Sequence, residues 1–272
     1  MQATTTAPSQ RRTAREIFEA VEDNGHDELR RSAKALAFSG LAGGLSMGLT
    51  GLAVAAAMLA LPPSPSREFV AYLVYPVGFI AVIIGRAQLF TENTLYPVAL
   101  VLSEKRHVLD TLRLWTVVFS CNVLGAAAFA LLAIKTPSLT PSMAGQLIQL
   151  GVRAAEGGSA HIFWSGIIGG WIIALVAWMV TASHWTIGQI AVIWILTFVV
   201  GIGHFSHCIA ASGEIVSAVL GGAVHFPRYL QWLGLATSGN IVGGVTIVTL
   251  LNFGQVKVGE LMETKSGGDE PW

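Results

Sequence analysis

The sequence predicts an all-α integral membrane protein with six transmembrane spans, organised as two repeats of three spans. Of its 272 residues, 53% are hydrophobic and only 12% are charged, whereas soluble domains carry about 25% charged residues. The 57 residues between Glu156 and Glu214 include no Asp, Glu, Lys or Arg. Because a spanning helix needs about 20 apolar residues, this stretch alone accommodates two spans.

Six apolar runs define the candidate spans. Their approximate bounds are 35–61, 69–102, 111–134, 159–182, 187–220 and 229–254. The second and fifth runs are too long for plain helices, and polar or glycine-rich segments interrupt them at 85–94 and 201–207. We therefore expect both helices to be broken there. The connectors are short, apart from a longer one at 135–158.

The segments outside the spans are polar. We expect a cytoplasmic N-terminal segment at 1–33, disordered over 1–11 and helical over 12–33, followed by a membrane domain at 34–256 and a cytoplasmic tail at 257–272. The N-terminal segment lacks the apolar core of a signal peptide. Ten Lys and Arg residues lie on the side of the termini and four on the other, which predicts cytoplasmic termini. The apolar stripe of the N-terminal helix comprises Ile17, Phe18, Val21 and Leu29.

Two short patterns recur along the chain. The segment Asn122–Ala126 resembles Asn240–Gly244 at a separation of 118 residues, and Leu89–Glu92 resembles His204–His207 at 115. Spans 1–3 would then correspond to spans 4–6, and Glu92 to the histidine at 207. A repeat of three spans is inserted upside down relative to its copy, and paired interrupted spans in such halves point to a substrate path near the midplane.

The broken helices favour an anion path. Backbone freed by a break is tolerated in a membrane where it lines a water-filled cavity or is buried in protein. Each half-helix after a break directs its positive N-terminal end towards the centre. Thr91 and Ser206 are expected to cap these half-helices. We expect Asn122, Asn240 and Asn93 to cap the freed backbone.

Several motifs in this order resemble the formate/nitrite transporter family over residues 14–256. They are Leu-Phe-Thr in span two, Asn-x-x-Gly in span three, Gly-Ile-Ile and Ala-Trp-Met in span four, Phe-x-His-x-Ile-Ala in span five and Gly-Asn-Ile-x-Gly-Gly in span six. The resemblance implies an aquaporin-like fold in a homopentamer of the bacterial inner membrane. It also implies one pore per subunit for formate, nitrite or a similar anion.

The resemblance also implies roles for particular residues. The family's pore centre matches Thr91 and His207, and its apolar constrictions match Leu89, Phe90 and Val200. Tyr75 and Phe79 fall on the same helix face. The sequence departs from the family where Ser206 replaces a glutamate and Gly170 an asparagine, while Glu92 is an added acid.

The ionisable residues in the spans have two interpretations each. With an ordinary pKa near 6.5, the histidine at 207 can lend a proton to a weak-acid anion, which then crosses the apolar rings neutral; alternatively it bonds the backbone. Glu92 either stabilises a helix end or faces the pore, and Glu214 is either functional or a buried structural carboxylate. Arg86 and Arg113 are expected to tie helices together or snorkel.

Other classes are less favoured. A hydrolytic group of Ser206, His207 and Glu92 or Glu214 is disfavoured, because adjacent helical residues project about 100° apart, so we expect no enzyme. A sensor or scaffold that does not transport remains an alternative. Neither break has the Asn-Pro-Ala turn of a water channel, and both cysteines lie in apolar stretches. We expect no metal, cofactor or nucleic acid; the expected partners are a small anion, the lipid bilayer and further copies of the chain.

Overall fold

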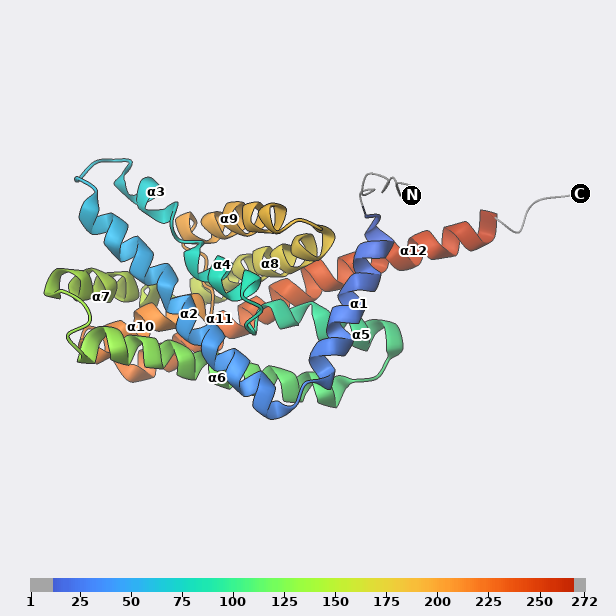
Figure 1. Cartoon of the computed structure of the whole chain (residues 1–272), viewed down its shortest axis with the longest axis horizontal. Helices are drawn as coiled ribbons and strands as arrows, with labels where there is room; N and C mark the ends of the chain where they lie inside the picture. The colour runs from blue at the N-terminus through green and yellow to red at the C-terminus, as the bar shows by residue number, and fades with distance from the viewer. Residues whose placement is uncertain (1–11, 267–272) are drawn as a thin grey trace, which may run out of the picture.

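The computed structural model describes residues 12–266, and within that range the chain contains only helices and connecting segments. The long helices run along the length of the molecule (Figure 1). One end carries α1 and α12, and the other carries α7 and the α2–α3 connection; they are named here the α1 end and the α7 end. The predicted disordered segment 1–11 and the last part of the predicted tail, 267–272, lie outside the described residues.

Four of the predicted spans form long helices close to their predicted bounds. The unbroken ones are α2 (Ala33–Ala60), α6 (Val108–Lys135) and α8 (Ser159–Ala182). The fourth is a continuous helix composed of α11 (Phe226–Val242), a π-helical stretch η2 (Gly243–Leu250) and α12 (Leu251–Ser266). This last helix therefore continues well past the predicted span end at 254.

The second and fifth spans are broken, as predicted. The second consists of α3 (Arg67–Tyr72), α4 (Val77–Ile84), a 3₁₀ turn η1 (Glu92–Thr94) and α5 (Tyr96–Glu104). The fifth consists of α9 (Thr186–Ile202) and α10 (Ala210–Leu220). An additional interruption separates α3 from α4 and contains Pro76, whose ring removes a backbone donor.

Two amphipathic helices lie outside the spans. α1 (Ala14–Arg30) begins with a capping box in which Thr13 and Glu16 satisfy each other's backbone N–H groups. It buries Phe18, Val21 and Leu29, three of the four residues in the predicted stripe. α7 (Pro141–Ala155) lies in the segment predicted as a connector and starts at the cap residue Thr140.

α1 and α7 occupy corresponding places against the two half-helices. A Cβ on Gly25 of α1 would meet the backbone carbonyl of Tyr96 in α5. A Cβ on Gly151 of α7 would meet that of Glu214 in α10. Each helix therefore packs backbone to backbone on the half-helix that follows a break.

Glycines also allow the long helices to approach closely. A Cβ on Gly44 of α2 would collide with the backbone of Asn122 in α6, and one on Gly170 of α8 with that of Asn240 in α11. Close helix approach through small residues is characteristic of membrane proteins, where van der Waals contact drives helix association. Gly170 stands where the family pattern has an asparagine, and this backbone has no room for an asparagine side chain there.

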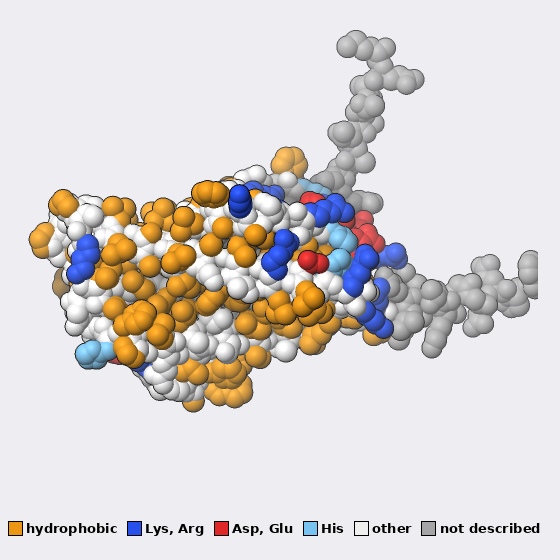
Figure 2. Space-filling model, turned by 90° about the horizontal axis from the view of Figure 1, so that it is seen from below, with side chains coloured by type: hydrophobic (Ala, Val, Ile, Leu, Met, Phe, Trp, Pro, Cys, Tyr) orange, Lys and Arg blue, Asp and Glu red, His pale blue; other side chains and the backbone are white. Residues whose placement is uncertain are grey.

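The surface is that of a membrane protein. Within residues 12–266, five helical segments are long and apolar enough to cross a bilayer, and α9 and α10 are shorter apolar helices. Figure 2 shows hydrophobic side chains along the length of one face, whereas charged and histidine side chains gather at the α1 end. Large apolar residues such as Phe38 and Ile187 are more than 70% exposed. The chain is therefore a multi-pass membrane protein.

Candidate functional site

A buried asparagine holds the backbone at the first break. Asn122 of α6 accepts a hydrogen bond from the N–H of Phe90 at 2.9 Å. Its amide nitrogen donates to the carbonyls of Gly40, at 2.7 Å, and Gln88, at 2.9 Å. The side chain thus satisfies two backbone groups that the break leaves without a helical partner, those of Phe90 and Gln88, and it ties the break to α2 through Gly40.

Asn240 does the same at the second break. It accepts from the N–H of Cys208 at 2.9 Å and donates to the carbonyls of Gly166, at 2.7 Å, and Ser206, at 2.8 Å. The two asparagines thus make the same three bonds, and in each break the bonded residues stand in the same order.

These bonds correct the predicted correspondence between the breaks. Gln88 corresponds to Ser206, and both pairs of bonded break residues are separated by 118 residues rather than 115. The counterpart of His207 is therefore Leu89, and the prediction that it is Glu92 was wrong. That prediction aligned two phenylalanines by type, whereas their backbones occupy different positions.

Thr91 and His207 meet at the centre of the molecule. The threonine hydroxyl lies 2.8 Å from His207 Nε2, and both residues are 0% exposed. His207 Nδ1 accepts a hydrogen bond from the N–H of Ala210 at 3.0 Å. Because Nδ1 is an acceptor, a neutral ring carries its proton on Nε2 and donates it to the Thr91 oxygen.

The prediction that Thr91 and Ser206 are helix caps was wrong. Neither precedes a half-helix directly, since α5 begins at Tyr96 and α10 at Ala210. The Thr91 hydroxyl bonds the imidazole instead, and the Ser206 hydroxyl lies 2.8 Å from that of Ser165 in α8.

A row of aromatic rings leads from the centre to the α7 end. The ring centroids of Phe79 and His207 are 5.2 Å apart, those of Tyr75 and Phe79 are 5.8 Å apart, and those of Tyr72 and Tyr75 are 5.8 Å apart. All four residues are buried. The row therefore separates the central hydroxyl from the cavity at the α7 end.

The other predicted apolar residues are also buried, but they point in different directions. Leu89 and Val200 are at most 1% exposed, and Val200 lines the cavity at the α7 end. Phe90 packs its ring against Trp115 and Phe119 of α6, at centroid distances of 5.6 and 5.0 Å. Its ring therefore lies with α6 rather than in the aromatic row.

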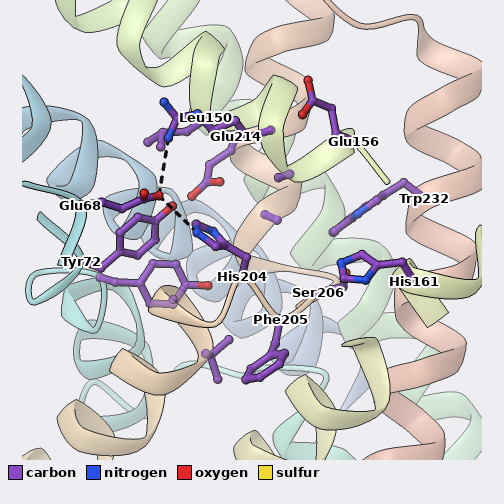
Figure 3. Close-up of a pocket in the computed structure, with 16 residues that line it drawn as sticks. Glu68, Tyr72, Leu150, Glu156, His161, His204, Phe205, Ser206, Glu214 and Trp232 are labelled. Carbon is purple, nitrogen blue, oxygen red and sulfur yellow. Dashed lines mark ion pairs between the residues drawn. The ribbon is translucent and has the colours of Figure 1, made fainter. Parts of the chain in front are cut away.

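The cavity at the α7 end has a volume of about 290 Å³ and opens between α3, α7, α9 and α10. Figure 3 shows Glu68 in ion pairs at its rim. The carboxylate lies 3.2 Å from His204 Nε2 and 3.6 Å from Arg153. Glu214 also lines the cavity, and among the described residues its carboxylate has no hydrogen-bond or ion-pair partner.

A smaller cavity of about 150 Å³ lies on the other side of the centre, at the α1 end. Arg86 and Glu92 line it together with Glu28 of α1. Arg86 is exposed, adopts a positive φ of 57°, and also lines an adjoining cavity of about 420 Å³ beside Thr181. The arginine thus stands at the mouth, whereas Arg113 donates to the Leu29 carbonyl at 2.7 Å and ties α6 to α1.

Asn93 supports the first break from within the loop. Its amide donates to Gln88 Oε1 at 2.8 Å and to the Leu89 carbonyl at 3.3 Å. Its own carbonyl accepts from the Trp115 ring at 2.8 Å. The loop that presents Thr91 is thus held on both sides.

Sequence reasoning missed the charged group at the α7 end. Glu68 belongs to α3, Arg153 to α7 and His204 to the second break, so no local pattern links them. Glu68 precedes an apolar run and His204 lies in a break, whereas Arg153 lies in the predicted connector 135–158. Knowing that 141–155 is a helix would have placed Arg153 beside the other two.

The chain has relatives among known proteins. Residues 15–254 match the sequence model of the formate/nitrite transporter family. Inner membrane protein YfdC of Escherichia coli is 33% identical over 244 residues, covering 89% of this chain and 78% of that protein. A probable formate transporter of Methanothermobacter thermautotrophicus is 33% identical over 196 residues, covering 65% and 71%.

The fold has a close counterpart among solved structures. A pentameric formate channel with formate bound superposes with a TM-score of 0.72 at 20% identity, covering 80% of this chain and 95% of that one. The family comprises channels and transporters rather than enzymes. Ser206 and His207 also bond different partners, so they do not form a nucleophile and base. The family match over most of the chain, together with the broken helices and the central Thr–His pair, shows that the protein belongs to the formate/nitrite transporter family.

Proposed function

We propose that each chain forms one pathway for small monovalent weak-acid anions, such as formate or nitrite, which runs between the two cavities through Thr91 and His207. The observation that carries the proposal is the buried hydroxyl–imidazole contact of 2.8 Å between them. The family, and a relative described as a probable formate transporter, support this substrate class.

The central pair offers a hydrogen-bond donor to an anion. A neutral His207 donates from Nε2 to Thr91, so the threonine's own hydroxyl hydrogen is directed elsewhere, and it has no other partner among residues 12–266. Moving a bare anion from water into a dry apolar constriction costs a free energy of several kcal/mol or more. This one donor, placed between apolar residues, lowers that cost without trapping the anion.

Donation of a proton from His207 to the anion requires one hydrogen bond of the ring to open. The ring must first carry protons on both nitrogens, but its Nδ1 faces the N–H of Ala210. Two N–H groups cannot share one hydrogen bond, so this bond has to open when the ring is charged. A proton on the ring can then pass through Thr91 to the anion, which crosses Phe79 and Tyr75 as a neutral acid.

The matched contacts support a membrane topology for the chain. Six spans in two inverted halves, as in an aquaporin-like fold, account for the equivalent bonds of Asn122 and Asn240 and for the equivalent places of α1 and α7. We propose that residues 34–256 form the membrane domain, with the α1 end in the cytoplasm, because Lys and Arg are concentrated there. A homopentamer in a bacterial inner membrane fits the relatives.

A liposome assay tests the proposal. Purified protein is reconstituted, and the internal pH is followed after addition of formate, nitrite, lactate or bicarbonate, alongside His207→Asn and the control His225→Asn. We expect anion-dependent pH changes in the native protein and in the control, and a lost or pH-shifted response in His207→Asn. An unchanged pH profile in His207→Asn contradicts proton lending. Absence of flux from folded pentamers favours a sensor or scaffold.

A further inference from the structure

Three side chains from separate parts of the sequence converge at the α1 end. His26 of α1 lies with its Nε2 2.8 Å from one oxygen of Glu104, at the end of α5. The Nε2 of His107, the residue before α6, lies 3.1 Å from the other oxygen. These three are the one group of three or more potential metal-ligating side chains found within the described part of the chain, and their ligand atoms lie within 4.8 Å of one another.

We propose that His26, Glu104 and His107 bind a divalent transition metal ion of the zinc class, which fastens α1 to the α5–α6 turn. Two imidazoles and one carboxylate form a ligand set typical of zinc, with water in the remaining position.

The spacing of the ligand atoms suits this ion. At metal–ligand distances of about 2.0–2.2 Å, the ligand atoms of a tetrahedral site stand roughly 3.3–3.5 Å apart. The present separations of 2.8 and 3.1 Å between the carboxylate and the imidazoles are close to that. The rings of His26 and His107 are edge to face, with centroids 5.9 Å apart. Small side-chain rotations therefore suffice to place an ion between them.

The surroundings of the cluster support metal binding. Asp110 lies 3.7 Å from His107 Nδ1, on the side of the ring that faces away from Glu104. A carboxylate behind a ligating histidine fixes its tautomer and raises its basicity. The guanidinium of Arg106 bonds the Glu104 oxygen that faces His107, and this exposed side chain has to turn away from that oxygen when the ion binds.

The sequence predicted no metal site because metal motifs have closely spaced ligands, whereas these three are far apart along the chain. Here α1 brings His26 to residues that follow it by more than 70 positions. The three side chains are half-buried, with exposures between 21% and 31%, so an ion can reach them from solution. Figure 2 shows histidine, acidic and basic side chains gathered at this end of the molecule.

The second half of the chain provides a matched control. His225 precedes α11 just as His107 precedes α6, 118 residues earlier. Among the described residues, His225 belongs to no such cluster. Replacing it removes an equivalent histidine without touching the proposed site.

The test uses the full-length protein in detergent, purified without a polyhistidine tag. Co²⁺ absorption and Zn²⁺ titration calorimetry are measured for the native protein and for His26→Ala, His107→Ala, Asp110→Asn and His225→Ala. We expect one ion per chain, with the visible bands of low-coordinate Co²⁺. Affinity should fall by more than about 100-fold in the two ligand variants, by about 10-fold in Asp110→Asn, and not at all in His225→Ala.

Two results overturn the proposal. One is absence of binding to the native protein, and the other is binding that persists unchanged in His26→Ala and His107→Ala, which places the ion elsewhere. Helicity and gel-filtration elution establish that each variant is folded. Should His26→Ala unfold, Glu104→Gln replaces it, since it keeps the shape of the side chain but removes the charge, and the same loss of affinity is expected.

Discussion

Several backbone contacts recur in the first and second halves of the chain, whereas the side chains at the centre differ. Asn122 and Asn240 each make two equivalent bonds to a break and a third to an unbroken helix, α2 or α8. α1 and α7 cover the following half-helices through glycines at corresponding places. The side chains that face the centre do not correspond, because the first break contributes Thr91 and the second contributes His207, whose counterpart is Leu89.

Matched backbone contacts can thus hold two breaks whose side chains form an asymmetric site. The repeated asparagine bonds only backbone atoms of each break. It therefore holds the same backbone position whatever side chains the break carries. The hydroxyl and the imidazole meet from positions that the repeat does not relate.

The largest expected effect concerns the shared asparagines. Asn122→Ala leaves the N–H of Phe90 and the carbonyl of Gln88 without partners, and Asn240→Ala does the same to Cys208 and Ser206. Each such buried group costs about 1–3 kcal/mol. We expect both variants to lower the apparent Tm in detergent by more than about 5 °C, and by similar amounts. Asn252→Ala serves as control, because its half-buried amide makes one bond, to Val248. A large effect in only one half would contradict the equivalence.

The next largest effect concerns Thr91 and His207 at the centre, whose side chains have no matching counterparts in the other break. Thr91→Val keeps the shape of the side chain but leaves His207 Nε2–H without its acceptor. An unsatisfied buried donor costs about 1–3 kcal/mol, and the anion loses its hydroxyl partner, so flux in liposomes should fall about tenfold or more. Thr116→Val removes an exposed hydroxyl on α6 that bonds Leu112 and should leave flux unchanged. Equal flux in both variants would exclude Thr91 from the path.

The spans were predictable because a bilayer imposes a length on apolar runs. The bounds of α8, for example, coincide with the predicted 159–182. Helix α7 was missed because its 15 residues are too short to span, although Thr140 before Pro141 and the spacing of Leu147 and Leu150 are typical of an amphipathic helix.

The centre was only partly predictable. The resemblance to the family implied that Thr91 and His207 share the centre, but the aligned phenylalanines suggested the wrong register between the two breaks. Phe90 turns towards α6, and Phe205 turns towards the cavity at the α7 end. The asparagine segments already repeat at 118 residues in the sequence, and the backbone hydrogen bonds show that the breaks keep the same separation.

The two mouths also differ in charge, which predicts opposite effects of a few-fold each. Arg86 stands at the α1 end and Glu214 in the cavity at the α7 end. Because a mouth charge changes the local anion concentration, Arg86→Gln should lower formate flux and Glu214→Gln should raise it. Both effects should shrink at high salt, where charges are screened. Asp27→Asn, which changes an exposed acid on α1, should have little effect; changes of the same sign in both mouth variants would contradict this assignment.

The smallest effect distinguishes α1 from α7. Both helices begin with a threonine cap, but only α1 has a glutamate three residues later. The Thr13 backbone N–H bonds Glu16 and lowers the pKa of its carboxyl. A carboxyl whose pKa is lowered by folding contributes stability above its unfolded pKa and loses it as the pH falls through its folded pKa. Hydrogen exchange should therefore show the first turn of α1 opening below about pH 4 while that of α7 stays protected.

Glu16→Gln distinguishes loss of this cap from unfolding of the whole protein at acidic pH. The amide can still accept a bond from Thr13 but does not titrate, so the first turn of α1 should become equally protected at neutral and acidic pH. If α1 and α7 lost protection together in the native protein, the carboxyl of Glu16 would not be the cause. The shared threonine cap would then account for both helix starts, and the two halves would be alike in this feature as well.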